Sequence, residues 1–485
     1  MNSNKVTVST KGHIIDPNCK YIDGSILEYN NDIYDCTLNQ TDLKSNKNKF
    51  YIMQIIKHGT GICCFIRYGR IGEIGVILYK NFVSDHLAVT HFEKQYKSKT
   101  GNNWHDKNQF VKKDGKYHMA TMDHADISLE SESEESETED QLDQEISYFL
   151  KVISNSSYMK KTLIQLEIDT DKMPIGKISQ KQIDKAYEVL NSINENLDDP
   201  DHLIKLSSDF YTLIPYSCSR SKKPPIINNK KLISKNAELL DELSQIAFGA
   251  KAIIKLKKSG INDFYQNLNT DILPLNWKDK MYHKLAKYII NSQAPTHNFC
   301  FEITSIFQIN RQFEREIYNS YSKKLKNKTL LFHGTRVSNM IGILQNGLMI
   351  DASKIGLNVV VTGKMFGYGL YFADSASKSL QYCAFDSSDN IACLLIAEVA
   401  LGNMLKKTKS DCTINSSTLP EKYHSTWGLG KSSYQEFEKI GKVRMPKGKL
   451  EELEEHSESV LLYDEFIVYN EQQINLKYLA LLKIN

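Results

Sequence analysis

Apolar and polar positions alternate along the first part of the chain as they do in a β-sheet. Three apolar runs, Phe50–Ile56, Ile62–Tyr68 and Ile74–Tyr79, are separated by turns that contain glycine. Each run has the length and the β-branched and aromatic content of a strand. A helix is expected at Val89–Lys97, where two aromatic residues lie four positions apart and so share one face. The pattern predicts a small β-rich module closed by one helix.

A helical period follows in the middle of the chain. Apolar residues recur every three or four positions near residues 142–153, 183–193 and 239–254, so each stretch presents one apolar face. Ser179, followed three positions later by Gln182, has the spacing of a capping box at the start of the second helix. These stretches predict an all-α bundle, which by itself indicates no chemistry.

From about residue 276 the chain mixes strands with short helices. One apolar run ends at His333-Gly334, and several glycines then surround Tyr371 and Tyr382. Glycine lets the backbone approach a ligand closely, and tyrosine rings offer flat apolar faces. Taken singly, His333 is more often a core or turn histidine, and each tyrosine is more often a core residue. Together they predict a slot for a flat ring that carries an amide.

Charge and composition limit the classes of function. The net charge of +3 is nearly balanced, so no partner follows from it. The segment Leu129–Glu145 is rich in Asp, Glu and Ser and contains no Lys or Arg, which predicts a solvated linker. Its side chains are also a hypothetical site of self-modification. No apolar run reaches the roughly 18 residues of a membrane helix, and no signal-like start is present, so a soluble intracellular chain is expected.

Two kinds of site are excluded by spacing. The nine cysteines lack the paired spacing of a zinc site, so no metal is expected. No G-x-G-x-x-G turn is present, and Ser425 stands where the first glycine of a phosphate loop before Gly430-Lys431-Ser432 is required. The chain is therefore neither a Rossmann protein nor a P-loop ATPase.

The motifs of the C-terminal part resemble one known family. His333-Gly334-Thr335 and the glycine–tyrosine block, followed by AEVALGNM, GLGKSS and LLYDEFIVYN, resemble the ADP-ribosyltransferase domain of the poly(ADP-ribose) polymerase family. The helical part, with KMPIGKIS, FYTLIP and KKPPIINN, resembles the family's regulatory domain. The first module, with NKFY, RYGRIG and KTGNNW, resembles its WGR domain, although Tyr68 replaces the tryptophan that gives this domain its name.

The resemblance implies a multidomain α+β chain. The expected parts are a disordered tail at 1–31, a β-rich WGR module at 32–122, an acidic linker at 123–141, an all-α regulatory bundle at 142–275 and a mixed α+β transferase domain at 276–485. In the family the bundle restricts access of NAD until DNA binding loosens it.

The resemblance also implies which residues use NAD as the ADP-ribose donor. The catalytic triad would be His333, Tyr371 and Glu465, in which the Glu465 carboxylate stabilises the positive charge that develops on the ribose. Gly334 and Ser379 would hold the nicotinamide carboxamide, between the rings of Tyr371 and Tyr382. The full set expected to bind NAD is His333, Gly334, Thr335, Lys378, Ser379 and Tyr382.

The expected partners are DNA strand breaks and protein acceptors that include the chain itself, in the nucleus. DNA contacts are expected from Asn48, Lys49, Tyr68, Arg70 and Tyr117, through phosphate charge and stacking. Two alternatives remain open, namely a mono-ADP-ribosyltransferase with the same domains and a DNA-end-binding scaffold with little catalysis.

Overall fold

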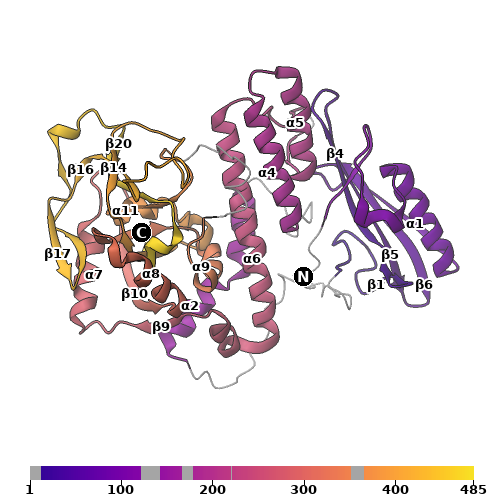
Figure 1. The fold of residues 1–485 in the computed structure, drawn as a ribbon. Coiled ribbons are helices and arrows are strands. Elements are labelled where there is room, and N and C mark those ends of the chain that lie inside the picture. The colour runs from indigo at the N-terminus through magenta and orange to yellow at the C-terminus, as the bar shows by residue number, and fades with distance from the viewer. Residues whose placement is uncertain (1–12, 122–141, 166–177, 220, 351–364) are drawn as a thin grey trace. The chain divides into compact units, whose positions relative to one another are not determined.

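The computed structural model describes residues 13–121, 142–165, 178–219, 221–350 and 365–485 (Figure 1). The chain forms two compact units, and both are discontinuous in sequence. Unit 1 contains residues 1–134 and 162–254, and unit 2 contains residues 135–161 and 255–485. The part expected to be one regulatory bundle is therefore divided between the two units.

Unit 1 is built on an antiparallel sheet with the strand order β7-β6-β5-β4-β8, and β1 pairs with β5. The strands are β1 (Ser25–Ile26), β4 (Asp35–Asp42), β5 (Lys47–His58), β6 (Gly61–Arg70), β7 (Val76–Phe82) and β8 (His118–Met119); β2 (Glu28–Tyr29) pairs with β3 (Asp32–Ile33). Helix α1 (Asp85–Thr100) begins after Ser84, whose hydroxyl accepts from the Leu87 N–H, and ends at Gly101 with φ 75°. The expected strands and helix are present, and each is longer than its apolar run.

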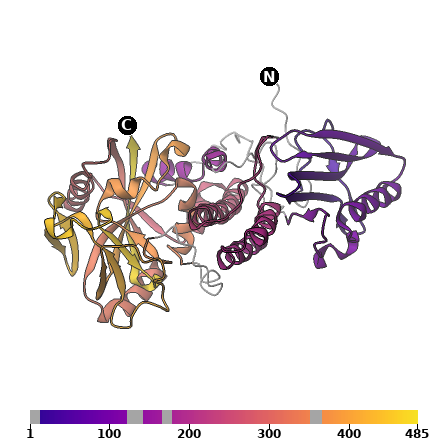
Figure 2. The ribbon, with the colours of Figure 1, turned by 90° about the horizontal axis from the view of Figure 1, so that it is seen from above.

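Helix α1 covers one face of this sheet (Figure 2). Its buried residues Phe92 and Tyr96 contact the ring of Trp104, at centroid distances of 4.9 and 5.0 Å. Trp104 lies in a short 3₁₀ helix (Trp104–Gln109). The core of the module is therefore aromatic, which agrees with the apolar spacing of the sequence.

The expected disordered tail is wrong for residues 13–31. Asp16 is 5% exposed and pairs with the buried Arg67 guanidinium, with Nη2–Oδ2 at 2.8 Å and Nε–Oδ2 at 2.9 Å. Gln54 holds the same segment by donating to the Ile14 carbonyl at 2.9 Å. Because a buried charge must be paired, this polar segment is needed to satisfy Arg67 and packs against the sheet. Residues 1–12 lie outside the described part.

Two helices of the expected bundle belong to unit 1. Helix α4 (Gln180–Glu195) packs on α5 (Pro200–Leu213). The α5 hydroxyls of Thr212 and Ser208 accept from the N–H groups of Thr41 and Leu43, at 3.0 and 3.1 Å. Helix α5 thus accepts backbone hydrogen bonds from the end of strand β4 and from the residue after it.

The capping box expected at Ser179 is wrong. The Ser179 side chain makes no capping hydrogen bond to α4. The Gln182 amide instead accepts from the Thr121 N–H and donates to the Leu213 carbonyl, both at 2.6 Å. The Gln182 side chain, which a capping box would use locally, is thus bonded to residues distant in sequence.

The remaining helices of the regulatory region are α2 (Gln144–Ile153), α3 (Ser156–Gln165) and α6 (Lys230–Asn267). The ring of Phe149 on α2 lies 5.2 Å from the ring of Phe307, so α2 packs within unit 2. Helix α6 is interrupted at Gly260, where φ is 84° and ψ is 171°. This conformation is open almost only to glycine.

Unit 2 contains a seven-stranded sheet with the order β17-β18-β11-β13-β22-β10-β9. Its strands are β9 (Asp271–Pro274), β10 (Phe301–Asn310), β11 (Lys328–Gly334), β13 (Ile391–Ala400), β17 (Glu436–Ile440), β18 (Val443–Lys447) and β22 (Ile474–Ile484). Neighbouring strands are antiparallel except β11 and β18, which are parallel. Helix α7 (Lys280–Asn291) packs through Leu285, Tyr288 and Ile289 onto the core residues of this sheet.

A second sheet, with the order β12-β21-β15-β14, adjoins the end of β11. Its strands are β12 (Leu370–Phe372), β14 (Met404–Lys407), β15 (Ser425–Gly428) and β21 (Glu465–Val468); the third sheet holds β16 (Gly430–Ser433), β19 (Glu451–Glu452) and β20 (Leu461–Tyr463). The short helices of this unit are α8 (Gln312–Tyr321), α9 (Met340–Asn346) and α11 (Ala376–Leu380). The class is multidomain α+β, as the sequence predicts.

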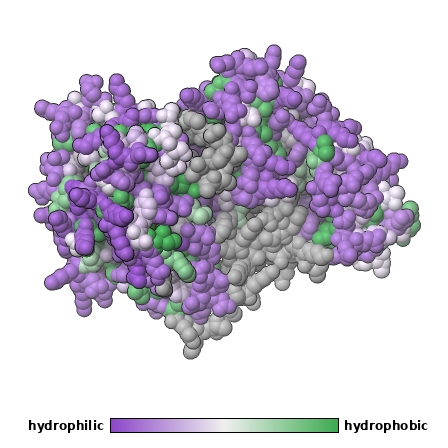
Figure 3. All heavy atoms as spheres, viewed as in Figure 1, coloured by the Kyte–Doolittle hydropathy of each residue, from purple (hydrophilic) through white to green (hydrophobic). Residues whose placement is uncertain are grey.

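The visible surface is mostly hydrophilic, with scattered apolar residues (Figure 3). In the described part of the chain, no helix combines the length and the hydropathy needed to cross a bilayer.

Candidate active site

The site begins where strand β11 meets the second sheet. Phe332 forms a bridge with Ala373, in which each N–H donates to the other carbonyl, at 2.7 and 3.0 Å. One residue further along β11, the His333 Nδ1 atom lies 2.9 Å from the Tyr371 carbonyl. Two members of the expected triad, 38 positions apart in sequence, are thus joined through backbone geometry.

Glu465 is the first residue of β21, the strand that pairs with β12. Its carboxylate is 8% exposed. The Lys378 ammonium lies 3.0 Å from the Glu465 Oε1 atom and donates to the carbonyls of Tyr463 and Asp464, at 2.8 and 3.3 Å. A buried charge pair with further hydrogen bonds has a defined geometry, so Lys378 fixes the position of this carboxylate.

Gly334 and Ser379 meet at the end of β11. A Cβ atom placed on Gly334 would lie 1.7 Å from the Ser379 carbonyl oxygen. Real Cβ atoms do not approach backbone so closely, so the packing of α11 against β11 requires glycine here. Gly334 and Ser379, which are expected to hold the same carboxamide, can lie this close because Gly334 has no side chain.

The two tyrosines of the site differ in how they are held. The Tyr371 hydroxyl accepts from the Phe366 N–H at 3.0 Å and donates to the Gly367 carbonyl at 2.8 Å. Burial raises the pKa of Tyr371 well above its usual range, with smaller contributions from nearby groups that include Glu465 and Tyr382. Tyr382 exposes 63% of its surface. One ring is therefore anchored and neutral, and the other is accessible.

Thr335, the last residue of the His-Gly-Thr motif, is half-buried. Its hydroxyl oxygen accepts from the Asn339 amide at 2.9 Å. The hydroxyl is thereby oriented at the mouth of β11, next to Gly334.

Sequence reasoning missed His297, which lies in the same region. Its Nδ1 atom is 2.8 Å from the Ser377 hydroxyl, and its ring contacts the Tyr463 ring edge-on at 5.4 Å. Burial and the nearby Lys378 ammonium lower the pKa of His297, which favours the neutral imidazole at neutral pH. An isolated histidine before β10 has no motif spacing, so nothing in the sequence pointed to it.

Sequence reasoning also missed two buried acids. Asp464 accepts from the Gly430 N–H and the Ser433 hydroxyl, both at 2.6 Å. Burial raises the pKa of Asp374, and the neighbouring Asp464 raises it further, whereas Lys378 lowers it. The ammonium of Lys378 therefore compensates several acidic groups, of which Glu465 is the one at the mouth of the site.

In unit 1, three of the five expected DNA contacts lie together. Tyr68, which is 36% exposed, stacks on Tyr51 at 5.7 Å, and Tyr117 contacts Tyr51 at 6.0 Å. The Lys99 ammonium lies 4.8 Å from the Tyr51 ring centroid, and Lys49 is exposed beside it on β5. We call Lys49, Tyr51, Tyr68, Lys99 and Tyr117 the tyrosine cluster.

The other two expected DNA contacts have protein partners. Asn48 is completely buried and donates to the Tyr216 carbonyl at 2.8 Å. The Arg70 guanidinium donates to the Lys222 carbonyl at 2.7 Å and to the Cys218 sulfur at 3.6 Å. The expectation that Asn48 is exposed to DNA phosphate is therefore corrected. In this structure its amide is buried and holds the segment after α5.

Several expectations fall outside the described residues. These include the acidic linker within 122–141, residues 172–177 of the KMPIGKIS motif, and one of the glycines that precede Tyr371, Gly363. Among the residues that the structure does describe, no group of three or more His, Cys, Asp or Glu side chains is arranged to hold a metal ion.

Comparison with known families agrees with this arrangement. The family model of the poly(ADP-ribose) polymerase catalytic domain matches residues 279–484. The model of the poly(ADP-ribose) polymerase regulatory domain matches residues 140–269, and the WGR model matches residues 34–111.

Individual relatives match over nearly the whole chain. Poly [ADP-ribose] polymerase 1 of Gallus gallus is 35% identical over 99% of this chain, which spans 48% of that relative. Poly [ADP-ribose] polymerase 2 of Arabidopsis thaliana is 33% identical over 95% of the chain, which spans 74% of it. The chain spans about half the length of the first of these two relatives.

A third relative is matched along most of its own length. Poly [ADP-ribose] polymerase 2 of Homo sapiens is 31% identical over 498 residues, which cover 97% of this chain and 83% of the relative. Identity above 30% along most of both chains, together with the three ordered family models, leaves one assignment. The chain is a member of the poly(ADP-ribose) polymerase family.

Proposed function

We propose that this chain transfers ADP-ribose from NAD to protein acceptors, itself included, extends the product into a polymer and is activated by DNA breaks. The observation that carries the proposal is the Lys378–Glu465 pair, at 3.0 Å, beside the His333–Tyr371 contact at 2.9 Å. Together they supply a fixed carboxylate next to a backbone slot.

In the proposed reaction, the bond between nicotinamide and the ribose C1′ atom breaks, and nicotinamide leaves as a neutral molecule. The ribose carbon becomes positively charged, as in glycoside cleavage. The Glu465 carboxylate stabilises this charge through the ribose 2′-hydroxyl. An acceptor oxygen then bonds to C1′, and its proton passes to the Glu465 carboxylate, which acts as general base.

The remaining residues position the substrate. The Gly334 backbone and the Ser379 hydroxyl hold the carboxamide, because an amide needs a donor and an acceptor side by side. The ring of Tyr371 covers one face of the nicotinamide, and Tyr382 covers the other. His333 and Thr335 bind the adenosine half, and Lys378 acts as a positioning residue through Glu465.

DNA is proposed to bind at the tyrosine cluster. Stacking on an exposed aromatic ring and neutralisation of phosphates by lysine are the general means of holding a DNA end. Asn48 and Arg70 would act indirectly, since both hold the segment between α5 and α6. The proposed location is the nucleus, because broken chromosomal DNA occurs there.

The test is incorporation of label from NAD into the full chain, with and without nicked duplex DNA. The expected result is a ladder of products that depends on DNA. A single shifted band would assign mono-ADP-ribosyl transfer instead. No incorporation under either condition, with the DNA still bound, would replace the enzyme by a DNA-end-binding scaffold.

A further inference from the structure

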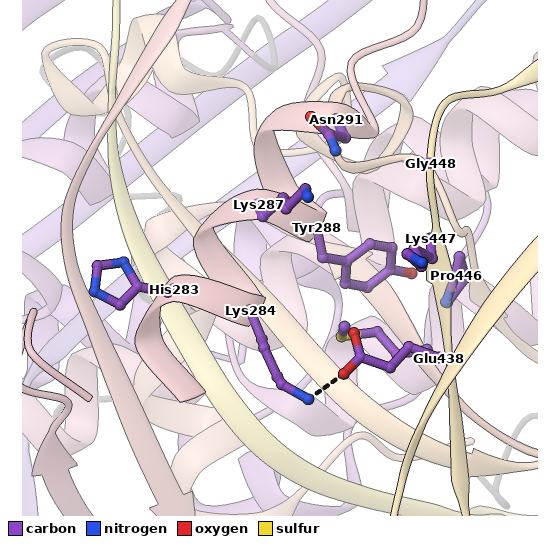
Figure 4. Close-up of a pocket in the computed structure, with 10 residues that line it drawn as sticks. His283, Lys284, Lys287, Tyr288, Asn291, Glu438, Pro446, Lys447 and Gly448 are labelled. Atoms are coloured by element: carbon purple, nitrogen blue, oxygen red, sulfur yellow. Dashed lines mark hydrogen bonds and ion pairs between the residues drawn. The ribbon is translucent and has the colours of Figure 1, made fainter. Parts of the chain in front are cut away.

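A cavity of unit 2 lies between helix α7 and the β17–β18 hairpin (Figure 4). Its volume is about 260 Å³. The residues that line it are His283, Lys284, Lys287, Tyr288, Asn291, Glu438, Met445, Pro446, Lys447 and Gly448. None of the residues expected to bind NAD is among them, so this cavity is separate from the active site described above.

The cavity has an apolar floor. Tyr288 and Met445 are each 3% exposed, and Pro446 is buried. The Tyr288 hydroxyl donates to the Leu330 carbonyl at 3.0 Å, and its ring stacks on Phe332 at 4.3 Å. Because both contacts are made to β11, the ring is fixed in place, as a preformed binding site requires.

The rim carries an excess of positive charge. Lys284 forms an ion pair with Glu438 across the cavity (Figure 4). Lys287 has no ion-pair partner in the described part of the chain, and the Lys447 ammonium is 3.9 Å from an exposed carboxylate, that of Glu436. Three ammonium groups thus surround the cavity, which one carboxylate lines. His283 points away from the other labelled side chains in Figure 4.

The hairpin wall is itself held rigid. The Arg444 guanidinium lies 3.8 Å from the centre of the Phe437 ring, across the paired strands β17 and β18. A cation over the face of an aromatic ring is attracted to it electrostatically, so this contact ties the two strands of the hairpin together. The opposite wall, α7, is anchored by the buried Leu285 and Ile289.

The position on the sheet separates this cavity from the triad. Successive residues of a strand point to opposite faces of the sheet, so Phe332 and His333 lie on different faces of β11. Phe332 contacts Tyr288, which forms the floor of the cavity. The His333 imidazole, on the other face, contacts the Tyr371 carbonyl.

Size and charge together select the ligand. The cavity is smaller than the roughly 300–1,000 Å³ of pockets that enclose drug-sized ligands, so it takes a phosphate group with one adjacent sugar or base. A duplex requires an extended basic track, because its charge is spread along the helix. A flat apolar floor with ammonium groups at the rim fits a nucleotide phosphate better.

We propose that this cavity binds the phosphate groups of one ADP-ribose unit, at a site distinct from the one that cleaves NAD. The ligand class rests on the proposed function, since the reaction makes ADP-ribose chains. A growing or finished chain held here would stay on the enzyme while its end is extended. Free ADP-ribose and an attached chain share the recognised chemistry.

The test uses the full chain with Glu465→Gln, so that binding is measured without turnover. Purified poly(ADP-ribose), free ADP-ribose and inorganic pyrophosphate are the probes, at 150 mM salt and with nicotinamide present to occupy the carboxamide slot. Lys287→Glu combined with Lys447→Glu is compared with Lys442→Glu, an exposed lysine in the turn of the same hairpin. The three lysines are exposed, whereas Glu465 is buried and its substitution is common to all the proteins compared. Thermal unfolding checks that each variant retains the fold.

The expected result is a loss of polymer affinity of tenfold or more in the double variant and less than twofold in Lys442→Glu. Competition by free ADP-ribose would identify the single unit as the ligand, whereas binding of polymer alone would identify the chain; both support the proposal. Equal losses in the two variants, no binding, or a larger loss for duplex DNA than for polymer would overturn it.

Failure of the proposed function gives a different result. If the parent chain incorporates no label from NAD, the added polymer still tests the cavity. If the parent chain is active, the double variant should keep the first transfer from NAD and release shorter chains.

Discussion

The candidate active site of unit 2 and the tyrosine cluster of unit 1 are built in different ways. In unit 2, strand ends and one short helix bring His333, Tyr371 and Glu465 together, and buried hydrogen bonds fix each of them. In unit 1, the exposed ring of Tyr68 stacks on the buried Tyr51 of a sheet. The segment after α5 contacts Asn48 on the same strand as Tyr51. In the first region, strand pairing determines where the site residues lie. In the second, the residues left accessible to DNA depend on which part of the sheet a later segment covers.

The largest expected effect is in unit 2. Glu465→Gln keeps the shape of the side chain but removes its charge and the ion pair with Lys378. We expect label incorporation from NAD to fall by about 10²–10³-fold, as when one preorganised electrostatic group is removed. Binding to nicked DNA should not change, because the tyrosine cluster is in unit 1. Retention of full activity would contradict the role given to this carboxylate.

Acid is expected to destabilise unit 1 through His118. Burial, and then the positive charges of Lys112 and Lys185, lower the pKa of His118 to about 4, against a smaller opposite effect of Asp209. The unfolded chain binds a proton as the pH falls through about 6.5, but the folded chain does not until about pH 4. Stability is therefore complete above pH 6.5 and is lost between pH 6.5 and 4, by about 3 kcal/mol.

The measurement is the fluorescence of Trp104 during urea unfolding, with Trp277 and Trp427 replaced by Phe. Trp104 is the only one of the three tryptophans in unit 1, so it reports that unit. The control is His118→Gln, in which the loss between pH 6.5 and 4 should be smaller by the stated amount. An identical pH profile in both proteins would show that His118 is not the cause.

A pair of substitutions separates the residues that hold the fold of unit 1 from those proposed to bind DNA. Asn48→Ala removes the hydrogen bond that the buried Asn48 amide donates to the Tyr216 carbonyl, which costs about 1–3 kcal/mol of stability. Lys49→Ala, one residue along the strand, should leave stability within about 0.5 kcal/mol and lower the affinity for nicked DNA and its salt dependence. Urea unfolding and binding titrations at two salt concentrations measure both. A loss of stability in Lys49→Ala would contradict the division proposed for this face.

The smallest expected effect is that of Tyr371→Phe. The change removes two hydrogen bonds, from the Phe366 N–H and to the Gly367 carbonyl, and costs about 1 kcal/mol of stability. The ring remains, so NAD turnover should fall less than threefold. A loss as large as that of Glu465→Gln would mean that the hydroxyl itself takes part in the reaction. Thermal unfolding and initial rates from the same preparations decide the point.

Much of the fold could be predicted where the signal is local. The apolar runs inside β5 and β6 and the face of α1 follow from periodicity alone. The segment at 13–31 could not be predicted, because it is polar and its order comes from the Asp16–Arg67 pair across 51 positions. The cap at Ser179 failed for a similar reason, since Gln182 is used by partners distant in sequence.

The site shows the same limit. Motif spacing identified Gly334, and the structure shows why no side chain fits there. His297 and the buried acids around Lys378 carry no motif and are visible only once β10, α11 and β21 are assembled. Asn48 and Arg70 lie in motifs that also contain exposed residues, and only the fold shows that the segment after α5 supplies partners for both.

The discontinuity of the two units has a consequence for biosynthesis. Chains leave the ribosome from their N-terminal end, so all the residues of unit 1 have emerged once residue 254 is outside. Helix α2 emerges earlier, but the aromatic ring that Phe149 contacts, that of Phe307, is translated much later. The apolar face of α2 therefore has no partner from unit 2 during the time in which the two sequence segments of unit 1 are translated. A chaperone that recognises exposed amphipathic helices has its longest opportunity at this stage of translation.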